Sequence, residues 1–241
     1  MRIGMGLAGA LLMLLGATAA SANDQIFDRQ VPAQPRGVVE ITNVSGSIEV
    51  SGWDRTEVSV HAELAGGVEG VEVSSEGGHT SIKVKQPAFY GHGGARLQVK
   101  GRGQPARLRA STVSGDLHLE HGGGDIEAGT VNGALIASLD GAHSVRARTT
   151  SGDLRFDGTL SHGATLEASS ISGSLIVRTG VDGGFAYEVS SFSGDISDCF
   201  NASPEHTKYG PGSRLAGTRG DGAGHIRLKT MSGDVQLCDR P

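Results

Sequence analysis

The sequence predicts an all-β, single-domain parallel β-helix (β-solenoid) with coils of about 18–21 residues. The first observation is a phrase, apolar-Ser-Gly-Asp-apolar in its commonest form, that returns at residues 113–117, 150–154, 171–175, 192–196 and 231–235. A degenerate copy occupies residues 131–135. The central glycines from Gly115 to Gly194 are separated by 18, 19, 21 and 21 residues, which is the period of a solenoid coil.

The second observation is a strict alternation of apolar and polar residues on both sides of each glycine, which is typical of a strand with one buried face. Seven residues before the glycine stand Leu108, Ile126, Val145, Leu166, Tyr187 and Ile226. Two residues after it stand Leu117, Leu135, Leu154, Leu175, Ile196 and Val235. Each coil is therefore expected to consist of a strand, a tight turn and a second strand, with repeat turns at Gly46, Gly115, Gly133, Gly152, Gly173, Gly194 and Gly233.

The third observation is that polar residues also form columns when the copies are aligned. If coils stack in parallel, residues at one offset lie about 4.8 Å apart. Six residues before the glycine, the copies in chain order read Arg109, Glu127, Arg146, Glu167, Glu188 and Arg227, so that opposite charges alternate at four of the five steps. Three residues before the glycine, the column consists of Thr and Ser, which we expect to form a hydroxyl ladder on a strand surface.

The elements follow in order along the chain. Residues 1–22 are expected to be a signal peptide, because Arg2 precedes a short apolar run that ends in Ala20-Ser21-Ala22. Residues 23–37 form an N-terminal extension, and residues 38–241 form the β-helix domain, with the first copy around Gly46 and less regular strands between residues 57 and 99. No later apolar run has the length of a transmembrane helix. The protein is therefore expected to be exported, to the periplasm, the extracellular space or the cell surface.

The composition limits the function. Without residues 1–22 the chain has 20 basic and 26 acidic residues, a net charge of about −6. Nucleic-acid binding needs a clustered positive field, so nucleic acid is not expected as a partner. Glycine supplies 39 of 241 residues, more than twice the usual share of about 7%, which indicates many turns and few large side chains.

The two cysteines predict a disulfide bond. Cys199 and Cys238 each lie five residues after the glycine of their copy, so they share an offset on neighbouring coils. Adjacent strands bring Cα atoms within the range that a disulfide tolerates, and an exported chain favours its formation. The pairing requires residues 201–224 to leave the stack as a loop excursion and not to form a further coil.

Several of these segments resemble a known family. Residues 46–54, the serial Ser-Gly-Asp turns, and residues 209–212 ahead of residues 229–235 are similar to the bacterial exported β-solenoid proteins grouped as DUF4097, which are regarded as adhesins. The likeness covers about residues 38–238. It implies a location in the bacterial cell envelope and an adhesin-like role, and it carries over no catalytic or ligand-binding residue.

The carboxylates are the first candidates for a catalytic site. Some β-helices are polysaccharide-acting enzymes with clustered carboxylates, and Asp116, Asp153, Asp195 and Asp234 share one column here. Ala134 and Ser174 interrupt this column, as expected of turn residues that make an Asx hydrogen bond. Asp195 and Asp234 become neighbours if residues 201–224 loop out.

The histidines and two short motifs give weaker indications. His143 and His162 share an offset and are expected to stack, and His118 and His121 form another pair, but a structural zinc site needs four convergent ligands. Residues 122–125 resemble one copy of a calcium-binding repeat that requires tandem copies. Arg219-Gly220-Asp221 spells a tripeptide that some adhesion receptors bind.

The sequence therefore predicts an exported, non-catalytic cell-envelope protein, an adhesin-like binding or structural module without cofactor or metal. Its partner is an envelope glycan or protein. Two alternatives stay open: an enzyme that acts on polysaccharide, and an envelope scaffold that self-associates through the ends of the solenoid, where strand edges are unpaired.

Overall fold

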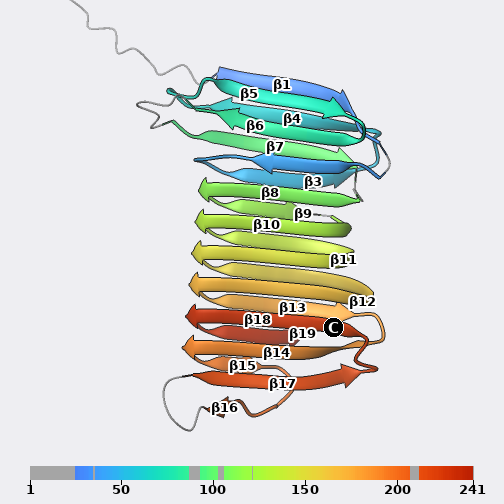
Figure 1. The fold of residues 1–241 in the computed structure, drawn as a ribbon, viewed down its shortest axis with the longest axis vertical. Coiled ribbons are helices and arrows are strands. Elements are labelled where there is room, and N and C mark those ends of the chain that lie inside the picture. The colour runs from blue at the N-terminus through green and yellow to red at the C-terminus, as the bar shows by residue number, and fades with distance from the viewer. Residues whose placement is uncertain are drawn as a thin grey trace, which may run out of the picture.

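The computed structural model describes residues 25–34, 36–86, 93–102, 106–120, 122–206 and 212–240. These residues form strands and turns that stack along one axis (Figure 1). The predicted all-β class is confirmed, and the arrangement is solenoid-like. The predicted signal peptide lies outside the described residues, as do His121 and residues 207–211.

The middle of the stack consists of coils that pair in parallel with the predicted register. Its strands are β8 (Arg107–Ser114), β9 (Leu117–Glu120), β10 (Gly124–Asn132), β11 (Leu135–Ser151), β12 (Leu154–Ser172) and β13 (Leu175–Val181). In β10, Ile126 pairs with Leu108 of β8 and with Val145 of β11, all seven residues before their glycines. β11 and β12 are long because each continues from one coil into the next through an irregular corner.

The buried columns form a thin core between the two strands of each coil. Leu117, Leu135, Leu154 and Leu175 are at most 1% exposed. Five residues before the glycines the opposing column consists of small residues, Ala110, Ala128, Ala147 and Ala168, which are equally buried. Alternating inward and outward residues along each strand thus produce one continuous core, as the alternation predicted.

The glycine corners bring neighbouring coils into direct backbone contact. The seven corner glycines have φ between +99° and +154°, a region that other residues rarely adopt. At Gly152, a Cβ atom would collide with the carbonyl oxygen of Gly133, and the same contact recurs from coil to coil. Glycine is therefore required at the corner both by the turn and by the stacking.

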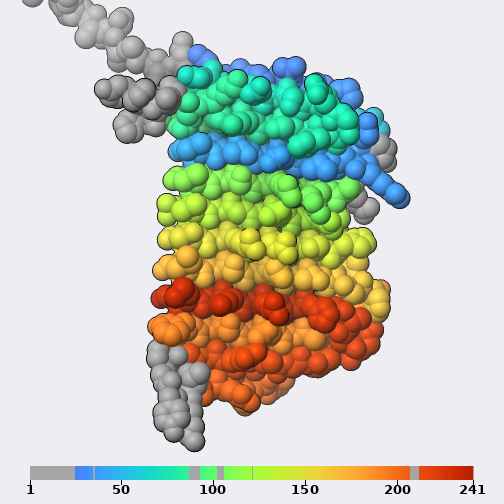
Figure 2. Space-filling view, viewed as in Figure 1, coloured from blue at the N-terminus to red at the C-terminus, as the bar shows by residue number. Residues whose placement is uncertain are grey.

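The C-terminal coil departs from the expected sequential order. β18 (Gly224–Ser232) and β19 (Val235–Asp239) lie between the coil of β12 and β13 and the coil of β14 (Gly184–Ser193) and β15 (Ile196–Asp198). Figure 2 shows this red coil between yellow-orange and orange ones. The chain places the coil of Gly194 one position further out and returns to fill the space, so the assumption that coils stack in chain order was wrong here.

The N-terminal coil is inserted in the same way. β2 (Val38–Thr42) pairs in parallel with β8 and with β6 (His79–Lys85). β3 (Ile48–Trp53) pairs in parallel with β9 and with β7 (Ala95–Arg102). The first copy of the repeat therefore lies inside the stack.

Antiparallel strands cover both ends of the stack. At one end β4 (Glu57–Leu64) pairs with β7 and with β1 (Gln25–Pro32), and β5 (Gly70–Glu76) pairs with β6. At the other end β17 (Ser213–Gly220) pairs with β14 and with the short β16 (Glu205–His206). Thus the expected extension at residues 23–37 contains β1, and the expected loop at residues 201–224 contains β16 and β17.

The column of Thr and Ser lies inside the protein and not on the strand surface that we expected. Thr112, Thr130, Thr149, Ser170, Ser191 and Thr230 are at most 5% exposed. Several of the hydroxyls donate to the carbonyl oxygen of a neighbouring corner glycine, as Thr130 does to Gly115 at 3.1 Å. This hydrogen bond satisfies half of the buried column. The hydroxyls of Thr112, Thr149 and Ser170 are buried without a hydrogen-bond partner among the described residues.

Candidate binding face

One face of the stack carries the regular surface columns, and we call it the ladder face. It is formed by β2, β8, β10, the C-terminal halves of β11 and β12, β18 and β14, in this spatial order. Outward side chains at six, four and two residues before the corner glycines form three parallel columns on it. They are a charge ladder, a column of small and basic residues, and an apolar ridge.

The charge ladder is more regular in space than in the sequence. In spatial order it reads Glu40, Arg109, Glu127, Arg146, Glu167, Arg227 and Glu188. The break expected between Glu167 and Glu188 does not occur, because the inserted strand β18 places Arg227 between them. Opposite charges therefore alternate at every step of the ladder.

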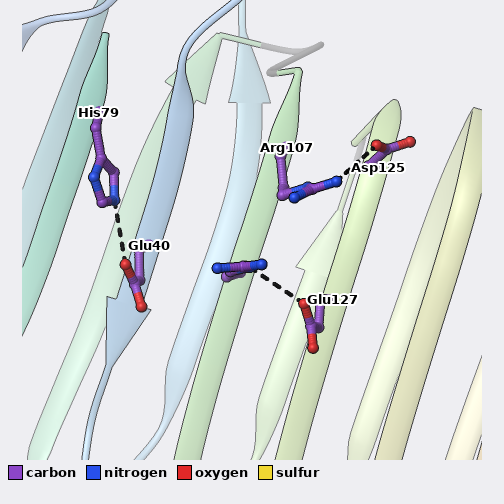
Figure 3. A network of polar contacts seen from close by, with 6 residues as sticks. Glu40, His79, Arg107, Asp125 and Glu127 are labelled. Carbon is purple, nitrogen blue, oxygen red and sulfur yellow. Dashed lines mark hydrogen bonds and ion pairs between the residues drawn. The ribbon is translucent and has the colours of Figure 1, made fainter. Parts of the chain in front are cut away.

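The charges are engaged in pairs that bridge neighbouring strands. Ion pairs join Arg109 to Glu127 at 3.2 Å, Arg146 to Glu167 at 3.0 Å and Arg227 to Glu188 at 3.3 Å. Figure 3 shows two further bridges, His79 to Glu40 at 3.2 Å and Arg107 to Asp125 at 3.4 Å. Exposed pairs of this kind contribute little to stability, so they serve mainly to keep the strands in register.

Arg146 is held in its charged form by its partner. The hydrogen bond and the charge of Glu167 raise the pKa of Arg146 above its ordinary value. Its guanidinium is therefore a permanent cation that is already matched by a carboxylate.

A hollow of about 450 Å³ opens on the ladder face over β2, β8, β10 and β11. The residues that line it include Glu40, Arg109, Glu127, Arg146 and Arg148. Its floor is open because Gly129 occupies a position where most neighbouring strands have a side chain. A Cβ atom at Gly129 would meet only the carbonyl oxygen of Arg148, at 3.8 Å.

The column four residues before the corner glycines contains the cations of this face that lack a partner. In spatial order it reads Thr42, Ser111, Gly129, Arg148, Ser169, Lys229 and Ser190. Arg148 and Lys229 are exposed, and within the described part of the chain neither side chain has an ion pair. They lie two strands apart with Ser169 between them, about 10 Å at the usual strand spacing.

The apolar ridge lies along the edge of the ladder face next to the corners. Val44, Val113, Val131, Ile171, Met231 and Phe192 are between 41% and 55% exposed, and Thr150 completes the column. This ridge was not among the predicted sites, although its residues occupy the first position of the repeated phrase. An outward apolar column of this length is uncommon on a soluble surface.

The predicted aspartate column has a structural role on the corner. Asp116 accepts a hydrogen bond from the backbone N–H of Ala134 at 2.8 Å, and Asp153 accepts one from Ser174 at 2.9 Å. Asp234 accepts one from the N–H of its neighbour Asp195 at 2.9 Å. These carboxylates therefore join adjacent coils, and the bond is made to the neighbouring coil and not within the turn as an Asx turn would make it.

His143 and His162 do not converge on a common site, and the other predicted pair, His118 and His121, cannot be placed because His121 lies outside the described residues. The register between β11 and β12 is irregular here: Ala142 pairs with Leu160, and Ser144 pairs with Thr165. His143 and His162 are therefore not paired with each other. His162 instead contacts the carbonyl oxygen of Asp182 at 3.1 Å. Among the residues described, no group of three or more His, Cys, Asp or Glu side chains is arranged to hold a metal ion. Asp125 of the glycine-rich run 122–125 pairs with Arg107.

The Arg219-Gly220-Asp221 tripeptide ends β17 beside a second hollow, of about 720 Å³. Arg219 is bound to Asp239 at 3.0 Å and lies over the ring of Phe200. Arg240, which also lines this hollow, pairs with aspartates of β11 and β12. The cations of this hollow are thus already engaged, which favours the ladder face as the binding surface.

The cysteines occupy the predicted positions. Cys199 and Cys238 form a disulfide with Cα atoms 4.8 Å apart. The bond connects the inserted C-terminal coil to the coil of β14 and β15, so the two coils are adjacent although their cysteines are 39 residues apart.

The comparison with protein families agrees with this architecture. The model of the family described as Toastrack DUF4097 matches residues 31–238. The chain belongs to this family. The resemblance noted in the sequence is therefore confirmed, and it extends to both inserted coils of this Toastrack DUF4097 protein. No curated protein matches the chain.

The Toastrack DUF4097 chain is also similar to solved structures. A "putative cell adhesion protein" from Clostridium sporogenes superposes with a TM-score of 0.52 at 9% identity, covering 90% of this chain and 100% of the other. A "putative adhesin" from Bacteroides fragilis has a TM-score of 0.45 at 12% identity, covering 91% and 99%. The first likeness supports a shared fold. In the described part of the chain, no helix is long and apolar enough to cross a membrane.

Proposed function

We propose that this protein is an exported, non-catalytic, adhesin-like module that binds an extended glycan of the cell envelope on its ladder face. The observation that carries the proposal is the three parallel columns of this face, which repeat over seven strands. A surface that repeats at a constant interval suits a polymer that also repeats. The proposal includes winding of the coils as a parallel β-helix and removal of residues 1–22 on export.

The arrangement favours binding over catalysis. Glycoside hydrolysis needs an acid and a second carboxylate that are free to act on one bond. On the ladder face the carboxylates are engaged with cations across the strands, as Glu127 is with Arg109 and Glu167 with Arg146. On the corners Asp116, Asp153 and Asp234 accept backbone hydrogen bonds. The likeness to a protein described as a cell adhesion protein supports the same role.

The test is binding of the processed chain, residues 23–241, to polysaccharides isolated from a bacterial cell envelope. Co-sedimentation should show saturable binding, and the polysaccharide should release neither reducing ends nor unsaturated sugars. Release of such products would favour the enzyme, and filaments that form with rising protein concentration in place of binding would favour the scaffold.

A pair of variants tests whether the ladder face is the binding surface. Ser169→Trp places a large side chain in the middle of the column between Arg148 and Lys229, and we expect it to weaken binding at least tenfold. Ser138→Trp makes the same change on the opposite face, where Ser138 is exposed and Ser169 on the ladder face is half-buried, and it should leave binding unchanged. Equal effects of the two substitutions would show that the ligand does not select this face.

A further inference from the structure

The unpartnered cations of the ladder face point to the chemical class of its ligand. Ion pairs neutralise the arginines of the charge ladder, including Arg109 and Arg146 at the hollow. In the next column Arg148 and Lys229 have no ion pair within the described residues and are both exposed. An anion that approaches this face therefore finds two free positive charges against a background of matched ones.

We propose that the ladder face binds a linear acidic polysaccharide in which carboxylate sugars alternate with neutral ones. This inference rests on the proposed function and names the glycan class that it takes. The separation of Arg148 and Lys229, two strand spacings or about 10 Å, suits carboxylates on every second sugar of a chain that runs across the strands. Ser169, between the two cations, faces the intervening neutral sugar with a hydroxyl.

The hollow at Gly129 extends this track by one strand beyond Arg148. With no side chain at Gly129, a sugar ring has room against the backbone of β10. Glu40 and Glu127 line the same hollow, and carboxylates accept hydrogen bonds from sugar hydroxyls. Arg148 stands at the side of the hollow as the donor to the sugar carboxylate, and its planar guanidinium suits a bidentate contact.

The charge distribution favours such a glycan over a nucleic acid. A nucleic acid carries one phosphate at every nucleotide, so its negative charges are closely spaced. On the ladder face Glu40, Glu127, Glu167 and Glu188 already match the other cations. Arg148 and Lys229 are too widely spaced to match a phosphate at every nucleotide. A polysaccharide with alternating charge needs only the two separated cations that this face offers.

The experiment measures the affinity of the disulfide-bonded chain, residues 23–241, for hyaluronan oligosaccharides, in which every second sugar carries a carboxylate. Dextran is the neutral control and single-stranded poly(dT) is the nucleic-acid control. Calorimetry should show binding to hyaluronan that weakens with salt, and binding to each control at least tenfold weaker. Tighter binding to poly(dT) would overturn the proposal in favour of a nucleic acid.

Charge-removing variants test the two residues. Arg148→Gln and Lys229→Gln should each weaken hyaluronan binding about five- to tenfold, and the double variant should lose most of the salt dependence. Arg155→Gln is the matched control, because Arg155 belongs to the same coil as Arg148, is exposed on the opposite face and has no ion pair within the described residues. An equal loss in Arg155→Gln would contradict the assignment.

The outcome also separates this inference from the proposed function. If envelope polysaccharide still binds to the double variant with unchanged affinity and Ser169→Trp abolishes that binding, the module function stands and the acidic-glycan assignment is wrong. If neither hyaluronan nor any envelope polysaccharide binds to the unmodified chain, both are wrong.

Discussion

The corner glycines are the residues on which the stack depends most directly. Gly152 has φ of +147°, and a side chain there would collide with the carbonyl oxygen of Gly133 in the neighbouring coil. The conformation and the contact independently exclude a Cβ atom.

We therefore expect Gly152→Ala to destabilise the protein by about 2 to 4 kcal/mol, measured by urea denaturation. Gly129→Ala is the matched control, because Gly129 lies in a strand, has no positive φ and has room for a methyl group. It should be neutral or stabilising by up to about 1 kcal/mol. A similar midpoint for Gly152→Ala and the unmodified chain would contradict the role of the corner.

The phenol of Tyr187 has a raised pKa, which makes the stability of the fold depend on pH in the alkaline range. Burial, with a further contribution from Asp198, raises the pKa of Tyr187, while Arg219 lowers it in part. The fold therefore favours the protonated phenol, so its contribution to stability is complete below the ordinary tyrosine pKa of about 10 and is lost as the pH rises through the higher value of the folded state.

Ultraviolet titration of the unmodified chain and of Tyr187→Phe tests this. The difference between the two curves should show phenolate formation above pH 10 or so. The phenylalanine keeps the ring contacts with Phe185 and Phe200, so the fold is retained. A difference curve with its midpoint at or below the ordinary tyrosine value would refute the prediction.

At the scale of elements, the disulfide joins two coils that are consecutive in space. The bond closes a loop across a separation of 39 residues. In the chain-entropy account this lowers the conformational entropy of the unfolded chain and so raises its free energy by about 4 kcal/mol. We expect Cys199→Ser with Cys238→Ser to lower the free energy of unfolding by an amount of that order, and the reduced unmodified chain to behave like the double variant.

Hydrogen exchange locates this effect. Amides of β15 and β19 should exchange faster in the double variant, whereas those of β8 and β10, several coils away, should not change. Uniformly faster exchange along the whole stack would mean that the disulfide stabilises the whole protein and not mainly the two coils that it joins.

At the scale of the whole molecule, both terminal coils are inserted one position inside the stack. A C-terminal truncation after Gly222 removes β18 and β19, which separate β12 and β13 from β14 and β15. β12 is a poor replacement partner for β14, because Glu167 would then face Glu188 without Arg227 between them.

We expect the truncated chain to lose amide protection in β14, β15 and β17, while β8 to β11 stay protected. Because truncation also removes Cys238, the control is the full-length Cys199→Ser, Cys238→Ser variant, which should keep protection in β14. Retained protection of β14 after truncation would show that the outer coil docks without the inserted one.

The binding face could be predicted only in part. The alignment of copies identified the cysteine pair and every residue of the charge ladder except Glu40, because offsets from the glycine determine which side chains share a column. The hollow at Gly129 and the pair of free cations, Arg148 and Lys229, were missed. Whether a cation is paired, as Arg146 is with Glu167, depends on side-chain contacts that an alignment does not contain. The apolar ridge was visible in the phrase itself, but its exposure was not.

The sequence by itself determined the all-β class, the coil length, the register, and the inward and outward faces apart from the buried column of Thr and Ser. These properties follow from local rules: alternation in a strand and the glycine that each corner requires. Only the tertiary structure decided the order of the coils, because each coil has similar buried columns and could pair with several others. Arg227 between Glu167 and Glu188, together with the return of the chain through β17, distinguishes the observed order from the sequential one.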